Sequence, residues 1–97
     1  MDDKELANKI IAGFLWNIPQ QIQMLKNYLE VGDITSAEQK AHAIKGASSS
    51  INAEVLRALA FEIEKNGRSG DLGAMNRLMP DLETQFEVLR EVLKKVI

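Results

Sequence analysis

Residues 41–71, AHAIKGASSSINAEVLRALAFEIEKNGRSGD, contain two amphipathic segments separated by a short turn. At roughly 100° per residue, one arc of the first segment, taken from about Ile34 to Ile51, collects only apolar or small side chains. The members of this arc are Ile34, Ala37, Ala41, Ile44, Ser48 and Ile51. Asn52 follows, and asparagine tolerates the left-handed backbone that ends a helix better than most residues do. The stretch predicts two helices joined by a tight turn, the first able to lie close to its neighbours.

The same helical period runs through the rest of the chain and indicates five helical segments. Their expected ranges are Asp3–Leu15, Ile18–Val31, Ile34–Ile51, Ala53–Asn66 and Asp71–Ile97. Pro19 suits the first turn of a helix, so we place a break between the first two segments at Asn17–Pro19. Pro80 falls inside the last segment and should kink or locally interrupt it.

The connecting segments are short, so sequential helices should be antiparallel neighbours. Gly32 and Gly70 are each followed by an aspartate, Asp33 and Asp71, that can cap the next helix. The predicted fold is all-α, an antiparallel up-and-down four-helix bundle with a short additional N-terminal helix.

The composition excludes several classes of function. The 97 residues are expected to form one domain, residues 1–97. The net charge is −2 and no block of Lys and Arg occurs, so no nucleic-acid partner is expected. The absence of cysteine and the single histidine remove disulfides, thiolate chemistry and multi-histidine metal sites. The acidic start MDDKEL argues against a signal peptide, and the apolar runs are far shorter than the roughly 20 residues of a membrane span.

The single histidine, His42, lies in the middle of the helix expected at Ile34–Ile51 and points nearly away from its apolar arc. Its neighbours on the exposed face are Gln39, Lys45, Gly46 and Ser49, at spacings −3, +3, +4 and +7. An imidazole that accepts a phosphoryl group must be neutral, must be reachable by another protein and needs positive charge nearby. This face of the helix supplies all three features.

Three of these neighbours, Lys45, Gly46 and Ser49, suit that chemistry. Lys45 can place an ammonium group near an incoming phosphoryl group, and Ser49 could donate a hydrogen bond. Gly46 costs about 1 kcal/mol relative to alanine inside a helix, and close approach of a partner is a reason to keep it. No second base and no set of metal ligands lies nearby in sequence, which indicates a carrier whose catalytic machinery is on its partner.

The quoted segment resembles the signature of histidine-phosphotransfer (HPt) domains, Ala-His-x-Leu-Lys-Gly-Ser/Ala-Ser/Ala, then Leu-Gly-Ala, a Leu-Glu pair and Gly-Asp. The matching positions are His42 on the phosphoacceptor, Lys45 and Gly46 on the Lys-Gly pair, Glu64 on the glutamate, and Gly70 and Asp71 on the final pair. Upstream, Phe14, Pro19 and Leu25 look like the family's phenylalanine, proline and leucine. The chain departs from the pattern at Asn52, where the family usually has glycine, and at Ile44, where it has leucine.

This resemblance implies a phosphorelay phosphocarrier without kinase activity of its own. His42 would take a phosphoryl group on Nε2 from a receiver-domain aspartate and pass it to another receiver in two-component signalling. The implied partners are response-regulator receiver domains and a hybrid sensor histidine kinase. No cofactor is expected on this chain, because the receiver would bring the Mg²⁺ ion. The protein is expected to be a cytoplasmic monomer, free-standing or a module of a larger, membrane-anchored hybrid kinase.

Two other interpretations stay open at this level. The chain could be a helical interaction module that binds receiver domains without being phosphorylated. An enzyme of another kind is disfavoured, because the sequence has no nucleophile–base pair and no phosphate-cradling loop. Ser48 is in phase with the core and is interpreted as a packing residue bonded to a helix carbonyl. Glu62 and Glu64 are interpreted as solvated charges, and Trp16 and Tyr28 as core or edge packing.

Overall fold

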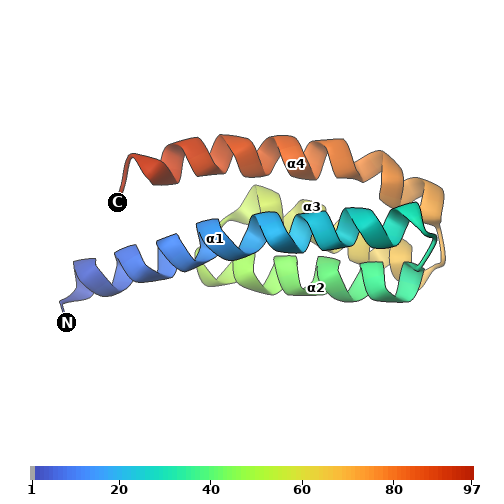
Figure 1. Ribbon diagram of the computed structural model, residues 1–97, viewed down its shortest axis with the longest axis horizontal. Coiled ribbons are helices and arrows are strands. Elements are labelled where there is room, and N and C mark those ends of the chain that lie inside the picture. Colours follow the sequence, from blue (N-terminus) through green and yellow to red (C-terminus); the bar gives the residue numbers. More distant parts are fainter. Residues whose placement is uncertain (1) are drawn as a thin grey trace.

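The computed structural model describes residues 2–97 (Figure 1). In it, three residues with a left-handed backbone conformation separate four helices. The helices are α1 (Asp3–Glu30), α2 (Ile34–Ser50), α3 (Glu54–Arg68) and α4 (Leu72–Lys94). They form an antiparallel bundle of 44 × 21 × 20 Å, and residues 2–97 contain no strand. The all-α four-helix bundle predicted from the sequence is confirmed.

The turns are built as the sequence indicates. Gly32, Asn52 and Gly70 have φ of 75°, 58° and 74°, so each turn uses one residue in the left-handed region. Asp33 and Asp71 cap α2 and α4, and their side chains accept backbone N–H groups three residues on at 3.1 and 2.9 Å. The departure from the HPt pattern at Asn52 therefore preserves the backbone conformation that the turn requires.

The short additional N-terminal helix was a wrong prediction, because α1 is continuous through Pro19. Proline removes one backbone hydrogen bond and costs about 3 kcal/mol inside a helix. That cost is outweighed because the buried stripe keeps one helical phase on both sides of Pro19. Its members are Phe14, Ile18, Ile22, Leu25 and Leu29. α4 likewise runs through Pro80 without interruption, although it bends in its first turns (Figure 1).

The core is a single cluster of apolar side chains shared by the four helices. Its members are Phe14, Ile18, Ile22, Leu25, Leu29, Ala37, Ala41, Ile44, Leu56, Ala60, Ile63, Met75, Met79, Leu82 and Phe86. In α2 the four buried positions, Ala37, Ala41, Ile44 and Ser48, all belong to the predicted arc, whereas Ile34 and Ile51 are half-buried. The buried Ser48 hydroxyl donates to the Ile44 carbonyl at 2.7 Å. Trp16 was expected to pack but is 77% exposed, whereas Tyr28 is half-buried against the core.

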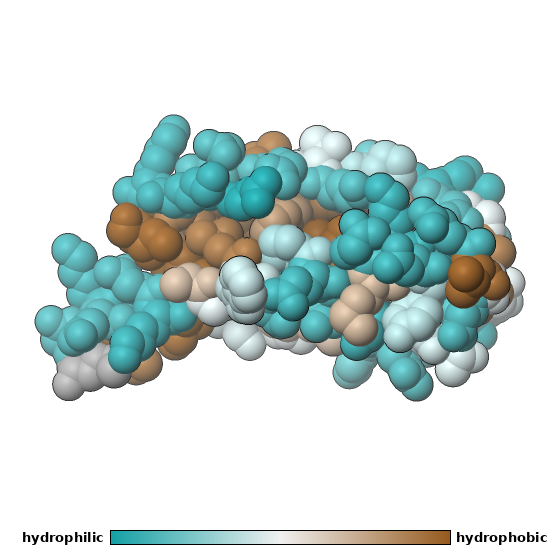
Figure 2. Space-filling model, in the orientation of Figure 1, coloured by the Kyte–Doolittle hydropathy of each residue, from teal (hydrophilic) through white to brown (hydrophobic). Residues whose placement is uncertain are grey.

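One end of the bundle carries exposed apolar residues. The first turns of α1 and the last turns of α4 extend beyond the turn that joins α2 to α3 (Figure 1). Figure 2 shows apolar surface between these two overhanging segments. The exposed large apolar residues of the two segments are Leu6, Ile10, Val88 and Val92, and the exposed Val96 and Ile97 follow the end of α4. The middle of α2, where His42 lies, is away from this end.

Replacing each of two helical glycines, Gly67 and Gly13, by alanine should change the stability of the fold in opposite directions. A Cβ on Gly67 would lie 3.0 Å from the Glu38 Cβ and 3.0 Å from the Met75 Cε, whereas a Cβ on Gly13 would meet nothing within 4 Å. Because the Glu38 Cβ is fixed to the α2 backbone, we expect Gly67→Ala to lower the free energy of unfolding by about 1–3 kcal/mol. Gly13→Ala should raise it by up to about 1 kcal/mol through helix propensity. Urea unfolding of both variants measures this, and equal shifts would contradict close packing at Gly67.

Candidate functional site

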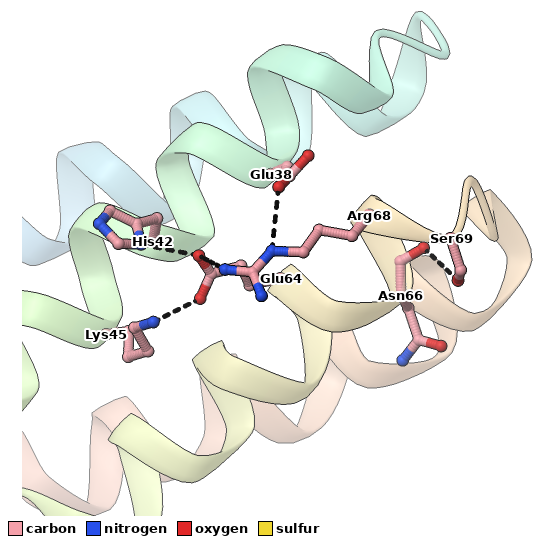
Figure 3. Close-up of polar contacts among 7 residues, drawn as sticks. All are labelled: Glu38, His42, Lys45, Glu64, Asn66, Arg68 and Ser69. Atoms are coloured by element: carbon pink, nitrogen blue, oxygen red, sulfur yellow. Dashed lines mark hydrogen bonds and ion pairs between the residues drawn. The ribbon is translucent and has the colours of Figure 1, made fainter.

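His42 lies on the outer side of α2 and its side chain is 66% exposed. Its ring leans toward α3, and its Nδ1 atom lies 2.7 Å from the Oε2 atom of Glu64 (Figure 3). The other ring nitrogen points away from Glu64. The histidine is therefore held at one nitrogen and open at the other, as a nucleophile approached by a second protein must be.

Glu64 is the centre of the polar network around His42. Its side chain is only 2% exposed, and a buried carboxylate is unfavourable unless it is paired. The Lys45 ammonium lies 2.7 Å from its Oε1 atom, and a guanidinium nitrogen of Arg68 lies 2.9 Å from its Oε2 atom. Arg68 also contacts Glu38 on α2, with 3.4 Å between the Arg68 Nε and Glu38 Oε1 atoms. The network ties α2 to α3 directly beneath the exposed ring (Figure 3).

The ionisation of Glu64 fixes which nitrogen of His42 carries the proton. Burial is the largest single effect on the pKa of Glu64, and it raises that pKa. The hydrogen bonds of Glu64 with Lys45 and His42, together with the charges of Lys45 and Arg68, outweigh burial and lower the pKa below its ordinary value. Glu64 is thus a carboxylate at neutral pH and can only accept hydrogen bonds. The Nδ1 atom of His42 must therefore be the donor, which leaves the lone pair of the neutral ring on Nε2.

The other predicted site residues share α2 with His42. Gln39, Gly46 and Ser49 are exposed. A Cβ added to Gly46 would meet nothing within 4 Å, so packing within the chain gives no reason for glycine there. Lys45 is only 24% exposed, and its ammonium also lies 5.2 Å from the centre of the Phe61 ring. Lys45 is thus a positioned cation beside His42.

Sequence reasoning missed most of this network. Glu64 was interpreted as a solvated charge, which is wrong, and neither Glu38 nor Arg68 was considered. The helical period of α3 held the signal, because Glu64 lies in the same helical arc as the apolar residues Ala60 and Ile63, and all three are buried. A carboxylate predicted to be buried needs partners, and this would have pointed to the neighbouring α2.

The site is on an open helix surface. A groove of about 570 Å³ lies between α3 and α4, and it is lined by Val55, Leu59 and Gln85 among others, but not by His42.

No helix in the part of the chain that the structure describes is long and apolar enough to cross a membrane. Residues 2–97 also hold no cluster of three or more His, Cys, Asp or Glu side chains suited to a metal ion.

The four-helix bundle thus carries one histidine that is exposed on a helix and oriented by a buried carboxylate. Among known families, the model of the Hpt domain matches residues 9–92. This match covers most of the chain, and the chain belongs to the Hpt domain family.

Two similar proteins extend this comparison. The phosphorelay intermediate protein rdeA of Dictyostelium discoideum is 25% identical over 91 residues, which are 94% of this chain and 36% of that protein. The chain therefore spans about a third of the length of this relative. The crystal structure of histidine-containing phosphotransfer protein B (HptB) from Pseudomonas aeruginosa PAO1 superposes with a TM-score of 0.88 at 26% identity. That superposition covers 98% of this chain and 91% of HptB.

The lowered pKa of Glu64 predicts how stability depends on pH. A carboxylate whose pKa is lowered in the folded state stabilises the fold at pH values above its ordinary pKa of 4.5. This contribution is lost as pH falls through the lowered pKa. We expect Glu64→Gln to be about 1–2 kcal/mol less stable than the wild type at pH 7. The loss should be no larger because the cationic partners of Glu64 can turn toward solvent in the variant. The deficit should shrink toward pH 3, as measured by urea unfolding across this range.

Glu62→Gln is the matched control, because Glu62 lies on the same helix but is exposed and forms an ion pair with the exposed Lys65. Its effect on stability should be small at every pH. A deficit for Glu64→Gln that stays constant between pH 7 and pH 3 would show that its ionisation does not stabilise the fold.

Proposed function

We propose that this chain is a phosphorelay phosphocarrier in which His42 takes a phosphoryl group from one receiver-domain aspartate and passes it to a second receiver. The observation that carries the proposal is the 2.7 Å contact between His42 Nδ1 and the buried carboxylate of Glu64, with the other ring nitrogen free. Membership of the Hpt domain family supports it independently.

The proposed step is a nucleophilic displacement at phosphorus. The Nε2 lone pair of His42 attacks the phosphorus of an aspartyl phosphate, a new N–P bond forms, and the P–O bond to the aspartate breaks. The aspartate leaves as a carboxylate, so no proton has to be supplied. The ring gains positive charge because Nδ1 keeps its proton, and the Glu64 carboxylate stabilises that charge through the existing hydrogen bond. The reverse of this step loads the second receiver.

The remaining site residues take supporting roles in this proposal. The ammonium of Lys45 is held beside His42 by Glu64, where it can approach the equatorial oxygens of the phosphoryl group. Gly46 lets the receiver surface come close to α2, and Gln39 and Ser49 contact it. The receiver supplies the aspartate and the Mg²⁺ ion, so this chain needs no cofactor of its own.

The proposed partners are response-regulator receiver domains and a hybrid sensor histidine kinase, with no kinase activity in this chain and a monomer as the working unit. A reactive nitrogen on an open helix favours brief encounters, in which local complementarity matters more than the area buried. The proposed location is the cytoplasm, either as a free protein or as a module of a membrane-anchored kinase.

Transfer from phosphorylated receivers tests the proposal directly. A panel of receiver domains carrying aspartyl phosphate should label the wild-type chain, and the label should be acid-labile and base-stable, as phosphohistidine is. His42→Gln should abolish labelling while retaining the helical fold, because the glutamine side chain has no nucleophilic ring nitrogen. Failure of every receiver to label the folded wild-type chain would favour the non-phosphorylated interaction module.

Lys45 provides a second prediction. We expect Lys45→Ala to slow phosphoryl uptake by about 3- to 30-fold, less than loss of a fully buried catalytic donor, because the site is open to water. Lys45→Arg should keep most of the rate, since it retains the charge. Lys40→Ala is the control, because Lys40 is two residues before His42 and lies on another face of α2. Equal rates for Lys45→Ala and Lys40→Ala in single-turnover transfer would remove Lys45 from the mechanism.

A further inference from the structure

The charged groups in the contact network of His42 sum to zero. Two carboxylates, Glu38 and Glu64, face two cations, Lys45 and Arg68, and all four lie in one connected set of contacts with the ring. The next charged groups on α3 are Lys65 and Glu62, which pair with each other at 2.9 Å. Removing any one member of the balanced set therefore leaves a net charge close to the imidazole.

Arg68 is the member that contacts both carboxylates. One guanidinium nitrogen lies 2.9 Å from the same Glu64 oxygen that accepts the His42 hydrogen bond, and its Nε lies 3.4 Å from Glu38. The guanidinium therefore sits between a carboxylate of α2 and one of α3, on the side of Glu64 away from Lys45 (Figure 3). Lys45 contacts the other Glu64 oxygen, Oε1, so Oε2 is shared by Arg68 and His42.

We infer that Arg68 is a positioning residue that keeps His42 neutral, by compensating Glu38 while it holds the Glu64 carboxylate against the ring. An uncompensated carboxylate beside an imidazole favours the cationic ring. A cationic ring has protons on both nitrogens and no lone pair on Nε2, so it cannot attack phosphorus. Arg68 would thus act through Glu64 and Glu38, without contact with the phosphoryl group.

The same charge balance affects the phosphoryl group itself, and this consequence rests on the proposed function. A phosphoryl group carries up to two negative charges as it approaches, so a site with net charge −1 would repel it. Loss of Arg68 would therefore slow uptake in two ways, by converting part of the nucleophile to its cationic form and by repelling the donor. Loss of Glu38 should instead increase the neutral fraction of His42 and attract the phosphoryl group.

The first test is made on the free protein and does not depend on any partner. The ¹⁵N chemical shifts of the His42 ring distinguish the cationic ring from each neutral tautomer. At neutral pH the ratio of cationic to neutral ring should rise about 3- to 10-fold in Arg68→Gln, as expected for one elementary charge within several ångströms in a largely aqueous setting. The ratio should fall in Glu38→Gln and return close to the wild-type value in the double variant.

Arg57→Gln is the matched control, because Arg57 also lies on α3 and pairs with a glutamate on its own helix, Glu54, at 3.0 Å. The ¹⁵N chemical shifts of the His42 ring in Arg57→Gln should match those of the wild type. Both Arg57 and Arg68 are at least one third exposed, so neither substitution should prevent folding. Identical His42 spectra for Arg68→Gln and the wild type would overturn the inference, whether or not the chain is a phosphocarrier.

The second test measures uptake from a phosphorylated receiver over a range of pH. Arg68→Gln should be about 3- to 10-fold slower near neutral pH and should need a higher pH to approach its maximal rate. The double variant Glu38→Gln/Arg68→Gln should recover to within about twofold of the wild type, since its local charge is again zero. A double variant as slow as Arg68→Gln would instead indicate a direct contact of the guanidinium with donor or phosphoryl group, and would contradict the positioning role.

Discussion

The buried carboxylate of Glu64 is the constraint on which the site depends. An ionised carboxylate that is 2% exposed must be compensated by charges and hydrogen bonds, and in this chain all of its partners come from α2 and α3. The same contacts that satisfy Glu64 therefore hold the His42 ring, place the Lys45 ammonium beside it and join the two helices. Orientation of the histidine is a consequence of satisfying a buried charge.

That arrangement requires small side chains on the buried face of α2. Ala37, Ala41 and Ser48 are fully buried there, and small side chains let the α2 backbone lie close enough to α3 for His42 to reach Glu64. Gly67 on α3 has the same effect from the other side, since a Cβ there would collide with Glu38. Packing in the core thus sets the distance across which the polar network forms.

The sequence predicted the parts of this structure that depend on one helix at a time. The phase of α2 placed His42, Gln39, Gly46 and Ser49 outside, and the structure agrees. It could not show that α1 continues through Pro19, because the cost of proline is local whereas the packing that outweighs it comes from the helices packed against α1, chiefly α2 and α4. The role of Glu64 was missed for the same reason, since a buried charge is recognised only when the partners on the adjacent helix are known.

The division of labour under the proposed function follows from this geometry. A carrier must both accept and release a phosphoryl group, so its histidine cannot hold the group too firmly in either direction. Glu64 stabilises positive charge on the ring, Lys45 stabilises negative charge on the phosphoryl group, and Glu38 with Arg68 leaves the sum near zero. A site that is electrostatically balanced and open to water favours neither state strongly. Under the proposed function, the receivers that dock on α2 would determine the direction of transfer, as a reversible intermediate in a relay requires.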